Sequence, residues 1–510
     1  MPSTASEYRL EKPPLVGRRN DLLVLISIAA CFAIGHIATN GRYGFHRDEL
    51  QFLTDARHLD WGFVAYPPMT PFLESISLRL FGLSLVGLRL FSVIAQAAVI
   101  LISGLMARDL GGGRLAQVTA TLTVGLSPLP IFEATEFQYT SFAFLWYALI
   151  AWFVIRLLKT ENPRWWLAIG AAVGMGLLTK YSITFFIAGL LAGLVLTGAR
   201  RYLASPWFWS GIALALLIFL PNFIWLAQHN FISYTFLQHI HQRDVGEGRA
   251  AGFLTGQFWL CANMAAAPVW IAGLIAYLLD RRYRMIALMY LVPLLLFWVS
   301  KGRFYYVAEA YPMLLAMGAV SAEQWLSRRK TWTRRSIEAV FFTGLFATGA
   351  YVCAILVPIA PSGPLRDFAL SKNGDLREEI GWDDLVRTIA GIRDSLPPSQ
   401  QASVGVLVGN YGERGAVEIL GPAYHLPHPI SLTNSGWLVS YPQQPPSTLI
   451  LVGVSHEFVD REFSACRIAG HKGNSQGVKN EESESRTDIF VCGPPRHPWP
   501  QLWKDNQWFG

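Results

Sequence analysis

Long hydrophobic runs separated by short polar segments occupy most of the chain up to about residue 358. About eleven of these runs have the roughly 17–25 apolar residues that a helix needs to cross a bilayer. They lie near 21–39, 84–107, 115–130, 140–158, 165–179, 181–198, 207–227, 257–279, 285–300, 304–321 and 337–358. The pattern predicts an α-helical polytopic membrane protein.

The pattern changes after Pro358. Short apolar runs at 402–408 and 448–454 have the length of buried strands, and the segments at 381–396 and 457–463 have helical spacing. Strands that alternate with helices favour an α/β domain. We therefore predict two domains, a transmembrane domain at 1–358 and an α/β domain at 359–510.

Composition agrees with a membrane location. Charged residues make up 15% of the chain and hydrophobic residues 52%, with a mean hydropathy of +0.32. A soluble protein usually carries about 25% charged residues. The net charge of +7 would suggest nucleic acid as a partner of a soluble protein. Here most of the excess lies in short loops, so it indicates topology and no nucleic-acid partner.

Lysine and arginine are concentrated in every second loop. By the positive-inside rule these loops are cytoplasmic. The N-terminus is then inside the cell, while the loop after the first run and the region after Pro358 lie on the periplasmic face of the inner membrane. The cationic loops contain Lys12, Arg18 and Arg19; Arg108 and Arg114; Arg156, Lys159 and Arg164; Arg200 and Arg201; Arg281, Arg282 and Arg284; and Arg328, Arg329, Lys330, Arg334 and Arg335.

Two of the five cysteines, Cys466 and Cys492, lie in the predicted outer domain near the ends of two predicted strands. An oxidising compartment permits a disulfide between them, and we expect this bond. Two free thiols are the alternative.

A polar cluster follows the first hydrophobic run directly: His46, Arg47, Asp48 and Glu49. Charges beside a bilayer are costly unless they face water or a site, so the cluster is a functional candidate. Apolar residues recur at helical spacing on both sides of Tyr66, which predicts two short helices on the membrane surface joined by the Tyr-Pro-Pro turn.

Other outer loops carry further cations and aromatic side chains: Lys180, Lys301, Arg303 and Tyr306. Such cations are suited to hold the phosphate of a lipid-linked sugar. Because that phosphate is already an anionic leaving group, transfer of the sugar needs one carboxylate base and no general acid. The chain has no HExxH or CxxC motif, so no metal site has motif support and the need for a divalent ion stays open.

Several short stretches occur together in one order: FHRDEL at 45–50, YPPMTP at 66–71, LTKY at 178–181, KGRFYY at 301–306 and NYGERGA at 410–416. In these the chain resembles the bacterial membrane glycosyltransferases of the GT-C fold, the dolichyl-phosphate-mannose-protein mannosyltransferase or family 39 type, which includes aminoarabinose transferases. The resemblance implies a GT-C fold and inverting transfer of a sugar from a polyprenyl phosphate. It also implies that the acidic residue of the first outer loop, which matches Asp48, is catalytic.

We therefore predict Asp48 as the general base with Glu49 as a second catalytic or orienting carboxylate. The predicted substrate-binding residues are His46, Arg47, Tyr66, Lys180, Lys301, Arg303 and Tyr306. Each has a plainer alternative. Asp48 is a favourable helix N-cap, the cations are suited to anchor at the interface, and the tyrosines suit an aromatic belt. Glu133 and Glu136 are the next candidates for the base.

The predicted function is transfer of a sugar from a polyprenyl-phosphate donor in the membrane to an acceptor hydroxyl on a glycolipid, polysaccharide or protein. The main alternative is a flippase or transporter of a lipid-linked sugar, for which repeated halves and mid-span charges are expected. We find no repeat in the sequence, which favours the enzyme. A non-catalytic scaffold would leave the outer carboxylates and cations unexplained.

The topology is testable with reporter fusions. Alkaline phosphatase fused after Leu365 should be active, because the enzyme folds only in the periplasm, and a fusion after Lys330 should be inactive. Activity of the Lys330 fusion together with inactivity of the Leu365 fusion would invert the topology and remove the predicted site from the periplasm.

Overall fold

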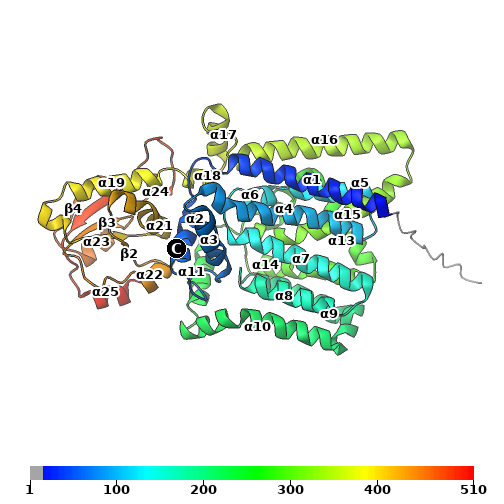
Figure 1. The fold of residues 1–510 in the computed structure, drawn as a ribbon, viewed down its shortest axis with the longest axis horizontal. Coiled ribbons are helices and arrows are strands. Elements are labelled where there is room, and N and C mark those ends of the chain that lie inside the picture. Colours follow the sequence, from blue (N-terminus) through cyan, green and yellow to red (C-terminus); the bar gives the residue numbers. More distant parts are fainter. Residues whose placement is uncertain (1–14) are drawn as a thin grey trace, which may run out of the picture.

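The computed structural model describes residues 15–510 and side chains from residue 20 onwards. Lys12, Arg18 and Arg19 of the first cationic cluster therefore lie outside the described side chains. Figure 1 shows a bundle of long helices on one side and a sheet-containing part on the other, with α2, α3, α11 and α18 between them. The mark for the C-terminus lies in this junction.

Each predicted hydrophobic run contains a helix, so the apolar runs located these elements correctly. The bundle helices are α1 (Leu15–Thr39), α4 (Leu85–Asp109), α5 (Arg114–Gly125), α7 (Tyr139–Thr160), α8 (Trp165–Leu177), α9 (Ile183–Leu196), α10 (Pro206–Gln228), α13 (Ala267–Leu279), α14 (Arg284–Val299), α15 (Tyr311–Ser327) and α16 (Thr331–Leu356). Short helices at the bundle's ends are α6 (Pro128–Glu133), α11 (Ile232–Gly246), α12 (Phe253–Trp259) and the 3-10 helix η3 (Phe304–Ala310).

Length and composition identify fewer spans than the sequence pattern did. Within the described residues, five helices are long and apolar enough to cross a membrane, or up to seven if each of two bent pairs counts as one span. The breaks follow α9, with a bend of 98°, and α12, with a bend of 94°. The protein is thus a multi-pass membrane protein, and the count of about eleven spans stays a prediction.

Glycines bring pairs of bundle helices into backbone contact. A Cβ on Gly170 of α8 would lie 2.1 Å from the carbonyl oxygen of Gly211 of α10. A Cβ on Gly318 of α15 would lie 1.8 Å from the carbonyl oxygen of Val269 of α13. In a bilayer, where the hydrophobic effect does not drive helix association, such close packing is a main source of stability.

The two predicted surface helices exist as α2 (Arg47–Arg57) and α3 (Met69–Phe81). Their placement on the membrane surface stays a prediction, but α2 is covered by protein, because every residue from 49 to 56 is buried. The helix α21 (Tyr411–Leu420) covers it so closely that a Cβ on Gly415 would lie 2.5 Å from Cβ of Leu50. The helical spacing was read correctly, but the covering partner lies more than 350 residues away in the chain and leaves no local signal.

The C-terminal part is built on a five-stranded sheet, which confirms the predicted α/β class. Its order is β2-β1-β3-β5-β4, with β1 parallel to β2 and β3, and β5 antiparallel to β3 and β4. The strands are β1 (Val404–Val408), β2 (Pro429–Ser431), β3 (Thr448–Val452), β4 (Arg467–His471) and β5 (Asp488–Cys492). The helices of this part are α17 (Pro364–Lys372), α18 (Gly374–Glu378), α19 (Trp382–Asp394), α20 (Pro398–Gln401), α21, α22 (Ser435–Val439), α23 (His456–Glu462), α24 (Glu481–Glu484) and α25 (Trp499–Asp505).

The sheet buries both faces. Val406 and Ile450 point into one cluster with α19, α21 and α2, whereas Leu407 and Leu451 point into a second cluster with α23 and α25. This alternation is the period of a strand covered on both sides. The first cluster also contains Leu50 of α2, so one core joins the two parts, and the division at 358/359 stays a prediction.

The predicted disulfide is confirmed: Cys466 is bonded to Cys492. Cys492 ends β5 and Cys466 directly precedes β4, the neighbouring antiparallel strand. The bond fastens the edge strand of the sheet at one end.

Candidate active site

The first turn of α2 holds the predicted catalytic carboxylates, and a capping box fixes it. His46 is the N-cap residue, and its Nδ1 accepts the backbone N–H of Asp48 at 3.3 Å. The carboxylate of Glu49 in turn accepts the backbone N–H of His46 at 2.8 Å. The alternative role of Asp48 as N-cap is therefore wrong, because His46 fills that position. The carboxylate of Asp48 is left to make other contacts.

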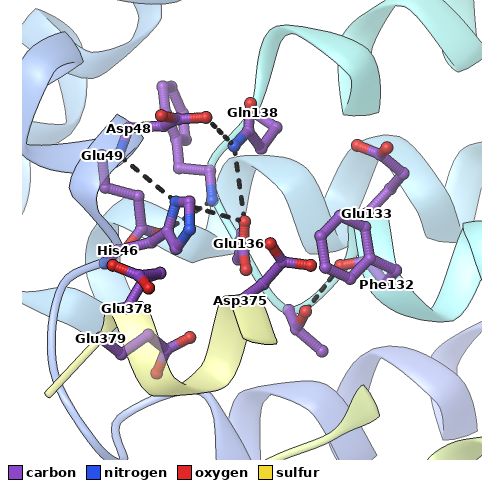
Figure 2. Close-up of polar contacts among 12 residues, drawn as sticks. His46, Asp48, Glu49, Phe132, Glu133, Glu136, Gln138, Asp375, Glu378 and Glu379 are labelled. Atoms are coloured by element: carbon purple, nitrogen blue, oxygen red, sulfur yellow. Dashed lines mark hydrogen bonds and ion pairs between the residues drawn. The ribbon is translucent and has the colours of Figure 1, made fainter. Parts of the chain in front are cut away.

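Two donors from distant segments orient the Asp48 carboxylate. Gln138 Nε2 donates to Oδ2 at 2.9 Å, as Figure 2 shows, and the hydroxyl of Tyr411 donates to Oδ1 at 2.9 Å. Burial raises the pKa of Asp48, but His46, Gln138, Arg47 and Tyr411 together outweigh it, so this pKa lies below the ordinary value of an aspartate. Asp48 is therefore an ionised, half-buried carboxylate at neutral pH.

Glu49 is fully buried and its oxygens are occupied. Arg89 donates to both carboxylate oxygens at 2.8 Å, the backbone N–H of Phe137 to Oε1, and that of His46 to Oε2. This is the geometry of an orienting neighbour, one of the two roles expected for Glu49. A carboxylate that already accepts four hydrogen bonds is poorly placed to take a proton from a substrate.

Arg89 connects the residues around Glu49 through ion pairs and hydrogen bonds. It is fully buried in α4 and also lies 3.1 Å from Glu379 and donates to the carbonyls of Asn40 and Gly44. A guanidinium with this many partners offsets much of its desolvation cost. It joins the end of α1, the first turn of α2 and the start of the C-terminal part.

More carboxylates surround the site than cations. Figure 2 shows Glu136, Asp375 and Glu379 grouped beside His46. Glu136 Oε2 lies 3.7 Å from His46 Nδ1 and 3.4 Å from Gln138 Nε2. Burial, then Asp375 and Glu379, raises the pKa of Glu136 well above its ordinary value, and burial raises the pKa of Glu379 to about 8. A protonated Glu136 is a weaker candidate for the base than Asp48.

The geometry of this group does not match a metal centre. Among the described side chains, no set of three or more His, Cys, Asp or Glu residues is arranged to hold a metal ion. Whether the reaction uses a divalent ion therefore stays open.

An aromatic cluster connects α2 to the predicted phosphate cation Lys180. The ammonium of Lys180 is buried, lies 3.3 Å from Glu309 Oε1, and sits 5.6 Å above the ring of Tyr139 and 5.2 Å above that of Tyr306. Tyr139 in turn lies 6.1 Å from Phe52 of α2. Since Gln138, which contacts Asp48, directly precedes Tyr139, a continuous run of contacts links Asp48 to Lys180.

Arg303 enters the same cluster through the tyrosines of η3. It forks onto both oxygens of Asp244 at 2.6 Å and donates to the hydroxyl of Tyr305 at 2.9 Å, whose ring lies 4.9 Å from that of Tyr306. Lys301 stays exposed, and within the described residues no ion pair is found for it. The structure thus brings together Lys180, Tyr306 and Arg303, with Lys301 at the edge.

Arg47 and Tyr66 have partners within the protein. The guanidinium of Arg47 stacks 4.8 Å above the ring of Tyr411 and pairs with Glu481, so it faces the C-terminal part. The hydroxyl of Tyr66 donates to Asp55, and its ring packs 4.8 Å from that of Phe52. These contacts pack Tyr66 against α2, next to the turn that carries Asp48.

Three residues of the site were missed by the sequence analysis: Arg89, Gln138 and Tyr411. Arg89 had a signal, because an arginine inside an apolar run is unusual and costly. Tyr411 lies in the NYGERGA stretch, which contributes to the family resemblance but indicates no role for this residue. Gln138 had no signal beyond its outer loop.

Comparison with known proteins agrees with this architecture. A sequence model of the family described as dolichyl-phosphate-mannose-protein mannosyltransferase matches residues 65–225. The lipid A galacturonosyltransferase RgtD of Rhizobium johnstonii is 26% identical over 221 residues, which cover 42% of this chain. The match spans 46% of that relative's own length, so the chain covers less than half of it.

Solved structures are similar over more of the chain. Crystal structures of ArnT from Cupriavidus metallidurans give a TM-score of 0.52 with undecaprenyl phosphate bound and 0.55 in the apo state, both at 14% identity. They cover 94% and 93% of this chain and 98% of the ArnT chain. The Archaeoglobus fulgidus oligosaccharyltransferase tethered to an acceptor peptide gives 0.52 at 13% identity, covering 80% of this chain and 64% of that one. These likenesses confirm the predicted GT-C fold.

The role of Arg89 predicts a large stability loss on its removal. Arg89→Met should lower the free energy of unfolding by about 3–5 kcal/mol, because Glu49 and Glu379 would remain buried without their cation. Denaturant unfolding of the purified protein in detergent, followed by tryptophan fluorescence, measures this. Arg79→Met changes an exposed arginine of α3 and should cost less than about 0.5 kcal/mol. Equal stability of the two variants would show that the Arg89 network does not hold the site.

Proposed function

We propose that the protein is an inverting glycosyltransferase that moves a sugar from a polyprenyl-phosphate donor to an acceptor hydroxyl on the periplasmic face of the inner membrane. The observation that carries this proposal is the ionised carboxylate of Asp48, which Gln138 and Tyr411 orient and which the neighbouring residues Gln138 and Tyr139 link to Lys180. The GT-C fold and the glycosyltransferase names of the relatives support the same reaction class.

The proposed step is a single displacement. The acceptor oxygen attacks the anomeric carbon on the side opposite the phosphate and gives its proton to the Asp48 carboxylate. The bond between the anomeric carbon and the phosphate oxygen breaks, and its electron pair leaves with the polyprenyl phosphate. Because this leaving group is already an anion, no acid partner is required, and attack from the opposite side inverts the anomeric centre.

Lys180 and Arg303 are proposed to hold the donor phosphate. In the structure each is paired with a carboxylate, Lys180 with Glu309 and Arg303 with Asp244. An ammonium has three donors and a guanidinium five, so both keep donors for phosphate oxygens while they are paired. The rings of Tyr305 and Tyr306 lie between the two cations. Polyprenyl phosphate as the carrier is supported by the ArnT crystal structure, which contains undecaprenyl phosphate.

Replacement of the base tests the proposal. Asp48→Asn keeps the side-chain shape but cannot take a proton, so transfer from a panel of polyprenyl-phosphate sugars should fall by about 10²–10⁴. The assay is run on purified protein in detergent, where there are no two sides, so product formation cannot come from a flippase or transporter.

The matched control is Asp367→Asn, which changes an exposed carboxylate of α17 outside the site and should keep full activity. Near-normal transfer by folded Asp48→Asn would defeat the assignment of the base. Absence of transfer by the unchanged protein with every donor in the panel would defeat the proposed function.

The hydrogen bonds to Asp48 predict the pH dependence of transfer. Asp48 acts when deprotonated, and its lowered pKa keeps it so at neutral and mildly acidic pH. Tyr411→Phe removes one hydrogen bond to the ionised form, so the pKa of Asp48 should rise and the acidic limb of kcat/KM should move to higher pH, while the rate near pH 8 changes much less. A rate lowered equally at all pH values would indicate that Tyr411 acts only through packing.

A further inference from the structure

A polar cavity of about 660 Å³ lies where the carboxyl ends of β1 and β3 face α2 and α11. We call it the strand-end crevice. Its walls come from the turns after β1 and β3, from Arg47, from His239 and Arg243 of α11, and from the last residues of the chain. Figure 1 shows the C-terminus at this junction. The volume is in the range of ordinary ligand sites, roughly 300–1,000 Å³.

The topology of the sheet opens this crevice. After β1 the chain enters α21 on one face of the sheet, and after β3 it enters α23 on the opposite face. Ligands of open α/β sheets bind where neighbouring parallel strands send their connections to opposite faces. The two turns touch: a Cβ on Gly409 would lie 2.1 Å from the carbonyl oxygen of Gly453. Gly453 has φ +67°, which favours glycine.

In the part of the chain that the structure describes, one cation of the crevice has no carboxylate partner. The lining cations are Arg47, Arg243, Arg249, Arg461, Lys472 and Arg486. The first five form ion pairs with carboxylates of the protein. Within the described residues, no ion pair is found for the exposed Arg486, whose guanidinium has one polar contact, the carbonyl oxygen of Gly453 at 3.5 Å. A guanidinium that faces a polar crevice without a carboxylate partner is suited to bind a phosphate group.

The rest of the wall suits a saccharide. Tyr411, Trp508 and Phe509 line the crevice and are half-buried. The apolar face of a pyranose ring stacks on such rings. Gln507 adds an amide group whose Nε2 is a buried donor without a partner among the described residues. Unpaired amide donors are suited to sugar hydroxyls.

The crevice also adjoins the proposed base. Tyr411 lines it and donates its hydroxyl to Asp48, and Arg47, the residue before Asp48, forms part of the same wall. Asp48 itself does not line the crevice, and Arg47 and Tyr411 are the lining residues next to it. The donor cations Lys180 and Arg303 are not among its lining residues.

We propose that the strand-end crevice binds the phosphate-bearing saccharide of the acceptor, with Arg486 as a principal phosphate contact. The identification of this ligand as the acceptor rests on the proposed function, but binding of a phosphorylated sugar in the crevice does not depend on transfer. It gives the C-terminal part the role of selecting an anionic sugar beside Tyr411, the residue that contacts Asp48.

Direct binding tests the crevice independently of catalysis. The purified full chain in detergent is titrated with N-acetylglucosamine 1-phosphate, N-acetylglucosamine and inorganic phosphate, with calorimetry or saturation-transfer NMR as the readout. The phosphorylated sugar should bind tightest. Arg486→Gln should weaken it by about tenfold, the usual effect of losing one charge-assisted hydrogen bond, and Arg486→Lys should restore part of the loss.

The matched control is Arg467→Gln, which changes an exposed arginine of the edge strand β4 that does not line the crevice. It should bind all three probes as the unchanged protein does. Equal binding by Arg486→Gln and Arg467→Gln would overturn the proposal. So would equal affinity for the sugar with and without phosphate, or for inorganic phosphate alone.

Transfer kinetics separate this proposal from the proposed function. With a phosphorylated acceptor, Arg486→Gln should raise the acceptor KM and leave the donor KM unchanged, whereas Asp48→Asn should lower kcat. If no donor supports transfer while Arg486→Gln still loses the phosphorylated sugar, the proposed function fails and the crevice stands.

Discussion

The buried pair of Arg89 and Glu49 is the interaction on which the site depends. Both side chains are fully buried, and each has its remaining polar atoms directed at backbone groups or at Glu379. Removing one partner of such a pair strands a charge in a low-dielectric interior, so the arrangement has few alternatives. It fixes the first turn of α2, and with it the direction in which the neighbouring Asp48 carboxylate points.

The two adjacent carboxylates differ in burial and in hydrogen-bond partners. Both oxygens of Glu49 point into the interior and accept hydrogen bonds from Arg89 and backbone donors, whereas Asp48 points toward Gln138 and Tyr411 and is half-buried. Successive residues of a helix point about 100° apart, so one can be structural while the next remains available for chemistry. On the proposed function, the inner carboxylate holds the outer one in place.

The C-terminal part completes the site. Leu50 of α2 shares a buried cluster with α19 and the sheet, and Gly415 lets α21 approach α2 at backbone distance. Through this contact Tyr411 reaches Asp48, and the strand-end crevice opens beside it. The proposed donor cations come from the bundle and the proposed acceptor cations mainly from α11 and the C-terminal part. Asp48, the proposed base, contacts both parts, through Gln138 of the bundle and Tyr411 of the C-terminal part.

The sequence by itself determined the elements whose cause is local. Apolar runs placed the helices, alternating loop charges gave the topology still to be tested, and the polar cluster after the first run, with the family resemblance, selected Asp48. The tertiary structure decided which side chains meet. Gln138 and Tyr411 are 90 and 363 residues from Asp48, and the cover of α2 comes from α21. Periodicity reports only which face of an element is apolar, whereas the partner of that face, and the difference between Asp48 and Glu49, depend on contacts between distant segments.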